Sequence, residues 1–261
     1  MSLLTEIADD SHGFGIGNTP LFKLGNTGIY SKLEYYNHFR SIKDRAAFFM
    51  LDYALKTGIL KKGMTVIEGS SGNTGIAIAG ISQLMGLKSE IIVPESTPEE
   101  TVKTLKMYGA DVVITSGNST ENSINYAVKK ALASPEKYFR PGQHENEMNS
   151  NAHYYGTGPE IAEKISQPDH LVIGIGTGGT ITGLSRFFKG RGNIRVTGII
   201  PENGSQITGL RNPFLSDYNS LIEEYEDYID EVVTISQDDA YRGVKELQEK
   251  YNLFCRPFVG C

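Results

Sequence analysis

Short apolar runs alternate with longer helical stretches along most of this sequence, from about Lys62 onward. The runs are rich in Val and Ile, and Gly, Pro or Asn separates them from the helical stretches. Strands that are apolar at nearly every position are typical of parallel sheets buried on both faces. The pattern predicts an α/β fold with doubly wound parallel sheets. We expect strands at 65–68, 90–93, 111–114, 170–175, 195–200 and 231–235, with helices at 73–85, 98–108, 119–132, 181–188 and 237–250.

Length and charge narrow the class of protein. A chain of 261 residues can form one large domain or two modest ones. Its 25 Lys and Arg against 31 Asp and Glu give a net charge of −6, and no basic block is present, so a nucleic-acid surface is not expected. The two cysteines, Cys255 and Cys261, provide no disulfide framework. With no signal-peptide pattern and no apolar stretch of about 18 residues, we expect a cytoplasmic protein that acts on a small molecule.

A first glycine-rich loop, residues 69–75, lies between an expected strand and an expected helix. Glycines there let the backbone approach a ligand, and free N–H groups at a helix N-terminus attract an anion. The loop also carries three hydroxyls and one amide, more hydrogen-bonding groups than a turn requires. Taken alone, it is equally compatible with a tight turn capped by Ser or Asn.

A second glycine-rich loop, residues 174–180, has the same position between a strand and a helix. Its backbone N–H groups and two Thr hydroxyls could form a phosphate-binding cup. Gly174, Gly176 and Gly179 also satisfy G-x-G-x-x-G, and Glu202 follows at about the spacing of a ribose-binding acid. A nicotinamide or flavin dinucleotide site is therefore an alternative interpretation of this loop.

Lys43 is the candidate nucleophile. It lies at an expected loop-to-helix junction, beside Arg45. A cation at the positive end of a helix and next to an arginine is disfavoured, so we expect a lowered pKa, which suits a nucleophilic amine. A solvated surface lysine is the alternative for this residue considered alone.

Five motifs together resemble the pyridoxal-phosphate (PLP) enzymes of the β-family, the cysteine synthase and cystathionine β-synthase group. They occur in family order over nearly the whole chain. They are Gly-Asn-Thr-Pro-Leu at 17–21, Ser-Ile-Lys-Asp-Arg at 41–45, Ser-Gly-Asn-Thr-Gly at 71–75, Gly-Thr-Gly-Pro-Glu-Ile at 156–161 and Gly-Thr-Gly-Gly-Thr at 176–180.

The resemblance implies a role for each matching residue. Lys43 would bind PLP covalently and act as the general base, and Asn73 would hydrogen-bond the 3′-oxygen of the cofactor. The phosphate would be bound by Gly176, Thr177, Gly178, Gly179 and Thr180. The substrate α-carboxylate would be bound by Ser70, Ser71, Gly72 and Thr74, with help from Gln143. No metal is expected, because the five histidines show no metal-ligand spacing.

The resemblance also implies a reaction and a domain organisation. The reaction is loss of a β-leaving group from O-acetylserine or O-phosphoserine, followed by addition of sulfide or another thiol to give cysteine. The fold would be the tryptophan synthase β-like PLP fold with two doubly wound domains. A smaller mobile domain (37–141) would close over the substrate, and residues 1–36 plus 142–261 would form the cofactor platform. A homodimer is expected on the same basis.

Arg211 is a candidate for recognising the leaving group. The segment Leu210-Arg211-Asn212 resembles one in O-phosphoserine-using sulfhydrylases, where the arginine meets the substrate phosphate. A guanidinium group suits a phosphate dianion. An exposed loop arginine without a functional role is the alternative.

The C-terminal segment departs from the family pattern. The family has Pro-Ser-Ser-Gly, with a serine hydroxyl facing the ring nitrogen of PLP, whereas residues 257–260 read Pro-Phe-Val-Gly and the sequence ends soon afterwards. Phe258 and Val259 therefore motivate alternatives to a shortened, active PLP enzyme. One is a catalytically impaired PLP-binding homologue with a binding or regulatory role, and another is a chain that continues past Cys261. The more distant nicotinamide-dependent oxidoreductase leaves Lys43 unexplained.

Overall fold

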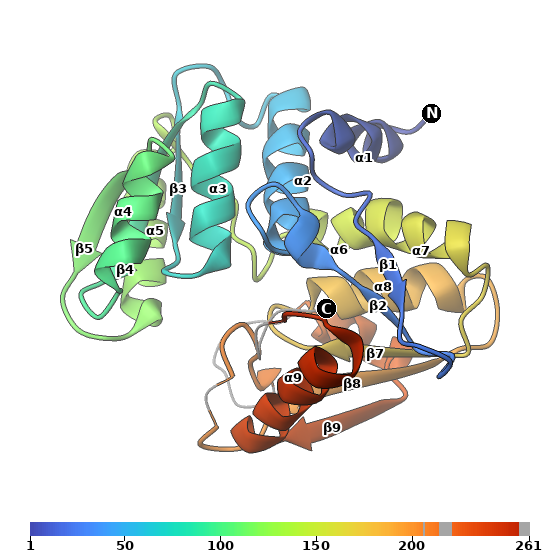
Figure 1. Ribbon diagram of the computed structural model, residues 1–261. Coiled ribbons are helices and arrows are strands. Elements are labelled where there is room, and N and C mark those ends of the chain that lie inside the picture. Colours follow the sequence, from blue (N-terminus) through green and yellow to red (C-terminus); the bar gives the residue numbers. More distant parts are fainter. Residues whose placement is uncertain (206, 214–220, 256–261) are drawn as a thin grey trace. The chain divides into compact units, whose positions relative to one another are not determined.

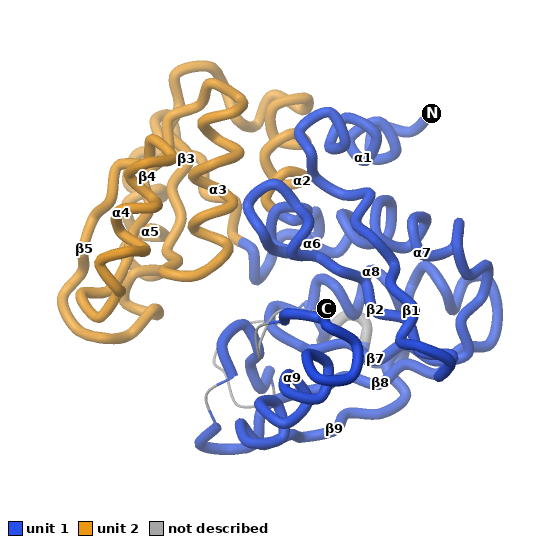
Figure 2. The backbone as a smooth tube through the Cα atoms, in the orientation of Figure 1, with its two compact units in different colours: residues 1–46, 143–261 blue, residues 47–142 orange. Residues whose placement is uncertain are grey.

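The computed structural model describes residues 1–205, 207–213 and 221–255. The backbone forms two compact units (Figure 1, Figure 2). Unit 1 is formed by Met1–Ala46 with Gln143–Cys261, and unit 2 by Ala47–Gly142. Helix α2 (Lys43–Lys56) begins in unit 1 and continues in unit 2. Each unit contains a parallel sheet of its own.

Unit 2 is built on a four-stranded parallel sheet with the order β5-β4-β3-β6. The chain steps from β3 to β4 to β5 and then returns to β6. Because such crossovers are right-handed, α3 and α4 lie on one face of the sheet and α5 lies on the other. The elements are β3 (Thr65–Gly69), α3 (Asn73–Leu84), β4 (Lys88–Pro94), α4 (Glu99–Met107), β5 (Asp111–Thr115), α5 (Thr120–Ala133) and β6 (Tyr138–Phe139).

The larger unit 1 contains a parallel sheet of the order β7-β8-β9 and an antiparallel pair, β1-β2. The apolar core of this unit is formed mainly by α8 and the parallel sheet. The strands are β1 (Leu21–Lys23), β2 (Tyr30–Lys32), β7 (His170–Gly174), β8 (Arg195–Pro201) and β9 (Glu231–Ile235). The helices are α1 (Leu3–Gly13), η1 (Glu34–Tyr36), α6 (Glu147–Ala152), the π-helical turn η2 (His153–Thr157), α7 (Gly158–Lys164), α8 (Gly179–Lys189), η4 (Glu223–Tyr228) and α9 (Gln237–Tyr251).

The predicted α/β fold is confirmed, but burial of every strand on both faces is not. Strands β3 and β4 in unit 2 and β8 in unit 1 are largely buried. Strands β5, β7 and β9 end the described sheets and are partly exposed. Ile114 in β5 is 59% exposed and Val172 in β7 is 61% exposed. An apolar sequence therefore does not by itself distinguish an edge strand from a central strand.

All six strands and all five helices expected after Lys62 are present at or near the expected positions. No helix among residues 1–205, 207–213 and 221–255 is both long and apolar enough to cross a membrane.

Candidate active site

Lys43 is the first residue of α2, and the preceding loop is held by the next residue, Asp44. The Asp44 carboxylate is buried and accepts hydrogen bonds from Phe39 N at 2.6 Å and Ser41 Oγ at 3.2 Å. Arg40 adopts the left-handed conformation, with φ 69°, which is unfavourable for a residue with a side chain. Burial raises the pKa of Asp44 to about 7, although the hydrogen bonds from Phe39 and Ser41 favour its charged form. The chain before Lys43 is therefore fixed by a buried carboxylate.

The predicted depression of the Lys43 pKa is confirmed, with a different neighbour as its electrostatic cause. Removal of the amine from water, together with a smaller contribution from the positive charge of Arg211, lowers the pKa of Lys43 to about 8. The sequence suggested Arg45 for this role. Arg45 instead binds two carboxylates, which neutralise its charge.

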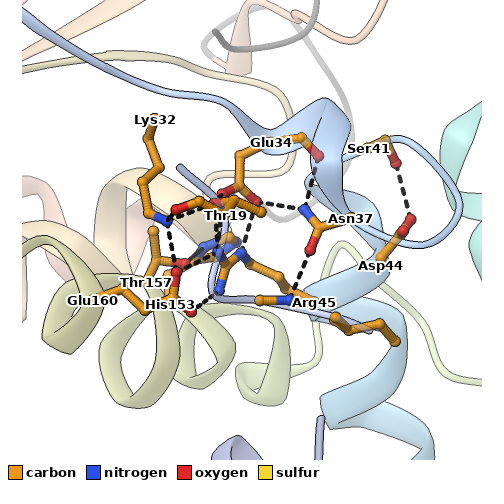
Figure 3. Close-up of polar contacts among 12 residues, drawn as sticks. Thr19, Lys32, Glu34, Asn37, Ser41, Asp44, Arg45, His153, Thr157 and Glu160 are labelled. Carbon is orange, nitrogen blue, oxygen red and sulfur yellow. Dashed lines mark hydrogen bonds and ion pairs between the residues drawn. The ribbon is translucent and has the colours of Figure 1, made fainter. Parts of the chain in front are cut away.

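Arg45 lies at the centre of a buried polar cluster in unit 1 (Figure 3). Its guanidinium donates to Glu34 through Nε at 2.6 Å and Nη2 at 2.9 Å. On its other side it donates to Glu160 through Nη1 at 2.6 Å and Nη2 at 2.8 Å. Burial alone would raise the pKa of both carboxyl groups, but Arg45 reverses this and holds the pKa of Glu160 at about 2. Both carboxylates therefore remain charged at neutral pH.

Lys32 and Thr19 complete the cluster. Lys32 Nζ contacts Glu160 Oε2 at 2.6 Å and the Thr19 carbonyl oxygen at 2.6 Å. Thr19 Oγ1 donates to Glu34 Oε1 at 2.6 Å. The cluster contains two cations and two carboxylates, so its formal charges cancel. It links the N-terminal segment to the first turn of α2 and to helix α7.

The second glycine-rich loop lies between β7 and α8 in unit 1. Gly178 has φ 89°, which favours glycine, and it caps α8. A Cβ atom at Gly176 would lie 2.4 Å from the Gly209 carbonyl oxygen, so that position has no space for a side chain. Arg211 N donates to the Ile175 carbonyl oxygen at 2.8 Å, which places the Arg211 segment beside this loop. The first amides of α8 have no intrahelical acceptors and can bind an anion.

Two side chains that the sequence did not single out hold the Thr hydroxyls of this loop. Asn149 Nδ2 donates to Thr177 Oγ1 at 2.9 Å. The His153 ring bridges Thr157 Oγ1 at 2.9 Å and Thr180 Oγ1 at 3.2 Å. Burial, together with the charges of nearby Arg45 and Lys43, lowers the pKa of His153 to about 3. The imidazole is therefore neutral at physiological pH.

The first glycine-rich loop lies between β3 and α3 in unit 2. Ser70 is buried, and its Oγ accepts hydrogen bonds from Gly72 N at 3.3 Å and Gly75 N at 3.2 Å. Ser70 therefore shapes the loop and still has a hydroxyl proton to donate. Asn73 is the first residue of α3, and Thr74 follows it in the first turn.

Gln143 begins the second segment of unit 1 and is 7% exposed. Its carbonyl oxygen accepts a hydrogen bond from Asn149 Nδ2 at 2.7 Å. The preceding residue, Gly142, belongs to unit 2, where its N–H donates to the buried Glu68 carboxylate at 3.0 Å.

The expected site residues are thus found in two groups. Unit 1 brings Lys43 within electrostatic range of Arg211, and it contains Gln143 and the loop 176–180. Unit 2 contains Ser70, Ser71, Gly72, Asn73 and Thr74 on one loop. The sequence missed Asn149, His153 and Glu34 as supporting residues. The spacing of four between Asn149 and His153 was an available signal, because residues four apart lie on one side of a helix.

The residues of unit 1 fit a phosphorylated aldehyde. Lys43 offers an amine that loses its proton near pH 8, and the neutral amine is the form that attaches covalently to an aldehyde. The amides at the start of α8 and the hydroxyls of Thr177 and Thr180 offer donors to a phosphate group. No group of His, Cys, Asp and Glu residues suited to a metal ion occurs within the described part of the chain.

Comparison with known families agrees with this chemistry. The family model for pyridoxal-phosphate dependent enzymes matches residues 13–261. The chain therefore belongs to this family, and pyridoxal phosphate is its cofactor.

Within that family the chain is similar to cysteine synthases. It is 38% identical to cysteine synthase B of Salmonella typhimurium over 250 residues, which cover 92% of this chain and 81% of that protein. It is 35% identical to the cysteine synthase of Aquifex aeolicus over 252 residues, which cover 92% of this chain and 76% of the relative.

Solved structures share the fold. A hydrogen sulfide-producing enzyme from Fusobacterium nucleatum matches with a TM-score of 0.85 at 29% identity, over 96% of this chain and 85% of that one. An O-acetylserine dependent cystathionine beta-synthase from Helicobacter pylori matches with a TM-score of 0.82 at 30% identity, over 98% of this chain and 86% of the other. The expected PLP fold is thereby confirmed.

Proposed function

We propose that this PLP-dependent enzyme catalyses β-replacement on O-acetylserine or O-phosphoserine and produces cysteine with sulfide as the nucleophile. The observation that carries the proposal is the low-pKa amine of Lys43, in the same unit as a glycine loop with two hydroxyls held by buried side chains. The similarity to cysteine synthases supports the choice of substrate and product.

Each candidate site residue of unit 1 has a defined role in this proposal. When bound, PLP supplies an electron sink that stabilises negative charge at the substrate Cα. Lys43 holds the cofactor covalently, and its Nζ removes the Cα proton once the substrate has displaced it. The loop 176–180 binds the cofactor phosphate through backbone amides and through the Thr177 and Thr180 hydroxyls. Gln143 helps to hold the substrate carboxylate.

The loop of unit 2 supplies the remaining groups. Asn73 binds the 3′-oxygen of the cofactor, and Ser70, Ser71, Gly72 and Thr74 bind the substrate α-carboxylate. Polar groups at the N-terminus of α3 suit an anion. We further propose that a mobile domain of residues 37–141 closes during the reaction and excludes water from the reacting atoms.

Arg211 is proposed to select the leaving group. Its guanidinium lies close enough to Lys43 to lower the pKa of that amine, and a guanidinium binds a phosphate dianion well. Arg211→Ala should therefore reduce turnover of O-phosphoserine and leave turnover of O-acetylserine much less affected. Unchanged turnover of O-phosphoserine in Arg211→Ala, or no preference for O-phosphoserine in the wild type, would exclude this role.

A visible absorption spectrum tests the cofactor and the role of Lys43 together. The wild type should show an absorption band from bound PLP, and this band should shift when O-acetylserine or O-phosphoserine is added. Lys43→Ala should lose the covalent chromophore and the reaction. A wild-type protein that stays colourless with added PLP would contradict the proposal.

The proposal also includes a cytoplasmic location and a homodimer. The family resemblance supports both the location and the dimer. Light scattering should give a mass twice that of one chain, which is 28.7 kDa.

The alternative functions have less support. The oxidoreductase leaves Lys43 without a role, and the residues behind the impaired homologue, Phe258 and Val259, lie outside the described residues.

A further inference from the structure

The side chain of Asn149 joins two parts of unit 1 that the proposed function assigns to substrate and cofactor. Asn149 belongs to α6 and is 2% exposed. Its Nδ2 donates to the Gln143 carbonyl oxygen at 2.7 Å and to Thr177 Oγ1 at 2.9 Å. One amide group therefore connects the residue proposed to hold the substrate carboxylate with a residue of the phosphate-binding loop.

The backbone carbonyl of Gln143 determines which end of the Asn149 amide acts as the donor. A backbone carbonyl oxygen can only accept a hydrogen bond, so the Asn149 group that faces it is the NH2 group, which has two protons to donate. Its second proton is donated to Thr177 Oγ1. The same oxygen accepts from Gly179 N at 3.4 Å. With both acceptor positions used, the Thr177 hydroxyl can offer only its own proton to a further partner.

Gly179 allows this arrangement by leaving space for the amide. A Cβ atom at Gly179 would lie 2.2 Å from Asn149 Oδ1. The side chain of Asn149 is therefore packed directly against the backbone of the loop. This close packing, together with the two hydrogen bonds, defines the orientation of the amide.

We propose that Asn149 is a positioning residue that keeps the Thr177 hydroxyl as a donor toward the phosphate of bound PLP. The inference rests on the proposed function, because a donor-only hydroxyl needs an acceptor such as a phosphate oxygen. Phosphate oxygens accept hydrogen bonds. If the Thr177 hydroxyl donated its proton to a protein acceptor instead, only its lone pairs would face the phosphate, and no hydrogen bond could form between them. Loss of one correctly oriented hydrogen bond to a charged group corresponds to about tenfold in affinity.

Titration of the cofactor-free protein with PLP and with pyridoxal, which lacks the phosphate, tests this role. Asn149→Ala should weaken PLP binding about tenfold and pyridoxal binding less than about threefold. Asn151→Ala is the matched control, because Asn151 is a buried amide of the same helix whose Nδ2 contacts Met148 Sδ at 3.8 Å. It should leave both affinities within about threefold of the wild type.

A double-mutant cycle identifies the route of the effect. In a Thr177→Val background, Asn149→Ala should change PLP affinity by less than about threefold, because the hydroxyl it orients is already absent. Asn149→Ser, a smaller change that cannot span both partners, should act in the same direction and serves if Asn149→Ala does not fold. Equal losses for PLP and pyridoxal, or an undiminished effect in the Thr177→Val background, would overturn the inference alone. A wild type that does not bind PLP would overturn the proposed function as well.

Discussion

The protonation of the Lys43 amine should control how fast the cofactor-free protein attaches PLP. Only the neutral amine is a nucleophile, and the pKa of Lys43 is lowered from 10.5 to about 8. The attachment rate should therefore rise as pH increases and level off above a midpoint near 8. Stopped-flow absorbance between pH 6 and 10 measures this midpoint, and a midpoint close to 10.5 would contradict the described environment of Lys43.

Arg211 should influence that midpoint. Its positive charge disfavours the protonated amine, so Arg211→Gln should move the midpoint for PLP attachment to higher pH. Arg195→Gln provides a control, because Arg195 is exposed and pairs with Glu231 at 2.7 Å. The same rate profile in Arg211→Gln and the wild type would show that Arg211 does not act on Lys43.

At the scale of elements, the β3-to-α3 turn should tolerate a methyl group at one glycine and not at another. A Cβ atom at Gly75 would lie 2.3 Å from the Ser70 carbonyl oxygen, whereas nothing lies within 4 Å of one at Gly72. Gly75→Ala should reduce the free energy of unfolding by about 1–3 kcal/mol. Gly72→Ala, with φ −111°, should stay within about 0.5 kcal/mol of the wild type. Urea denaturation compares the two, and equal stabilities would contradict the tight turn.

The elements that the sequence predicted are those with a strong local pattern. The strand at 231–235 coincides with β9, and the helix expected at 237–250 is α9, Gln237–Tyr251. The helices between Glu147 and Lys164 were not predicted. The sequence of α6 shows no apolar pattern with a period of 3.6 residues, because this helix packs through buried Asn and Ser side chains.

In the candidate site, too, features encoded by short sequence motifs could be predicted, and contacts between residues far apart in the sequence could not. Lys43 and both glycine loops could be identified from short motifs. The partners of Arg45 could not, because Glu160 lies 115 residues further along the chain. Arg211 as the charged neighbour of Lys43 was missed for the same reason. A sequence identifies the groups that perform chemistry more readily than the folded contacts that tune them.

At the scale of the whole molecule, the Arg45 cluster ties three separate stretches of unit 1 together. Arg45→Met would leave the buried carboxylates of Glu34 and Glu160 without their shared cation. Removing one member of a buried ion pair costs about 3–5 kcal/mol. Arg195→Met, which breaks the exposed pair with Glu231, should cost less than about 1 kcal/mol. Chemical denaturation measures both, and similar small losses would show that the cluster is not important for stability.

The π-helical turn His153–Thr157 determines how far the polar face before it and the polar face after it are rotated from each other about the helix axis. Helix α6, this turn and α7 follow one another without a break from Glu147 to Lys164. Each residue of an α-helix advances by about 100°, so the additional residue in a π turn rotates everything after it by one such step. Asn149 precedes the turn and donates a hydrogen bond to Thr177 in the second glycine-rich loop, and Glu160 follows the turn and binds Arg45. Deleting one residue of the turn would regularise the helix and rotate Glu160 away from its partner, so an apparent irregularity aligns the second glycine-rich loop with the helix that carries Lys43.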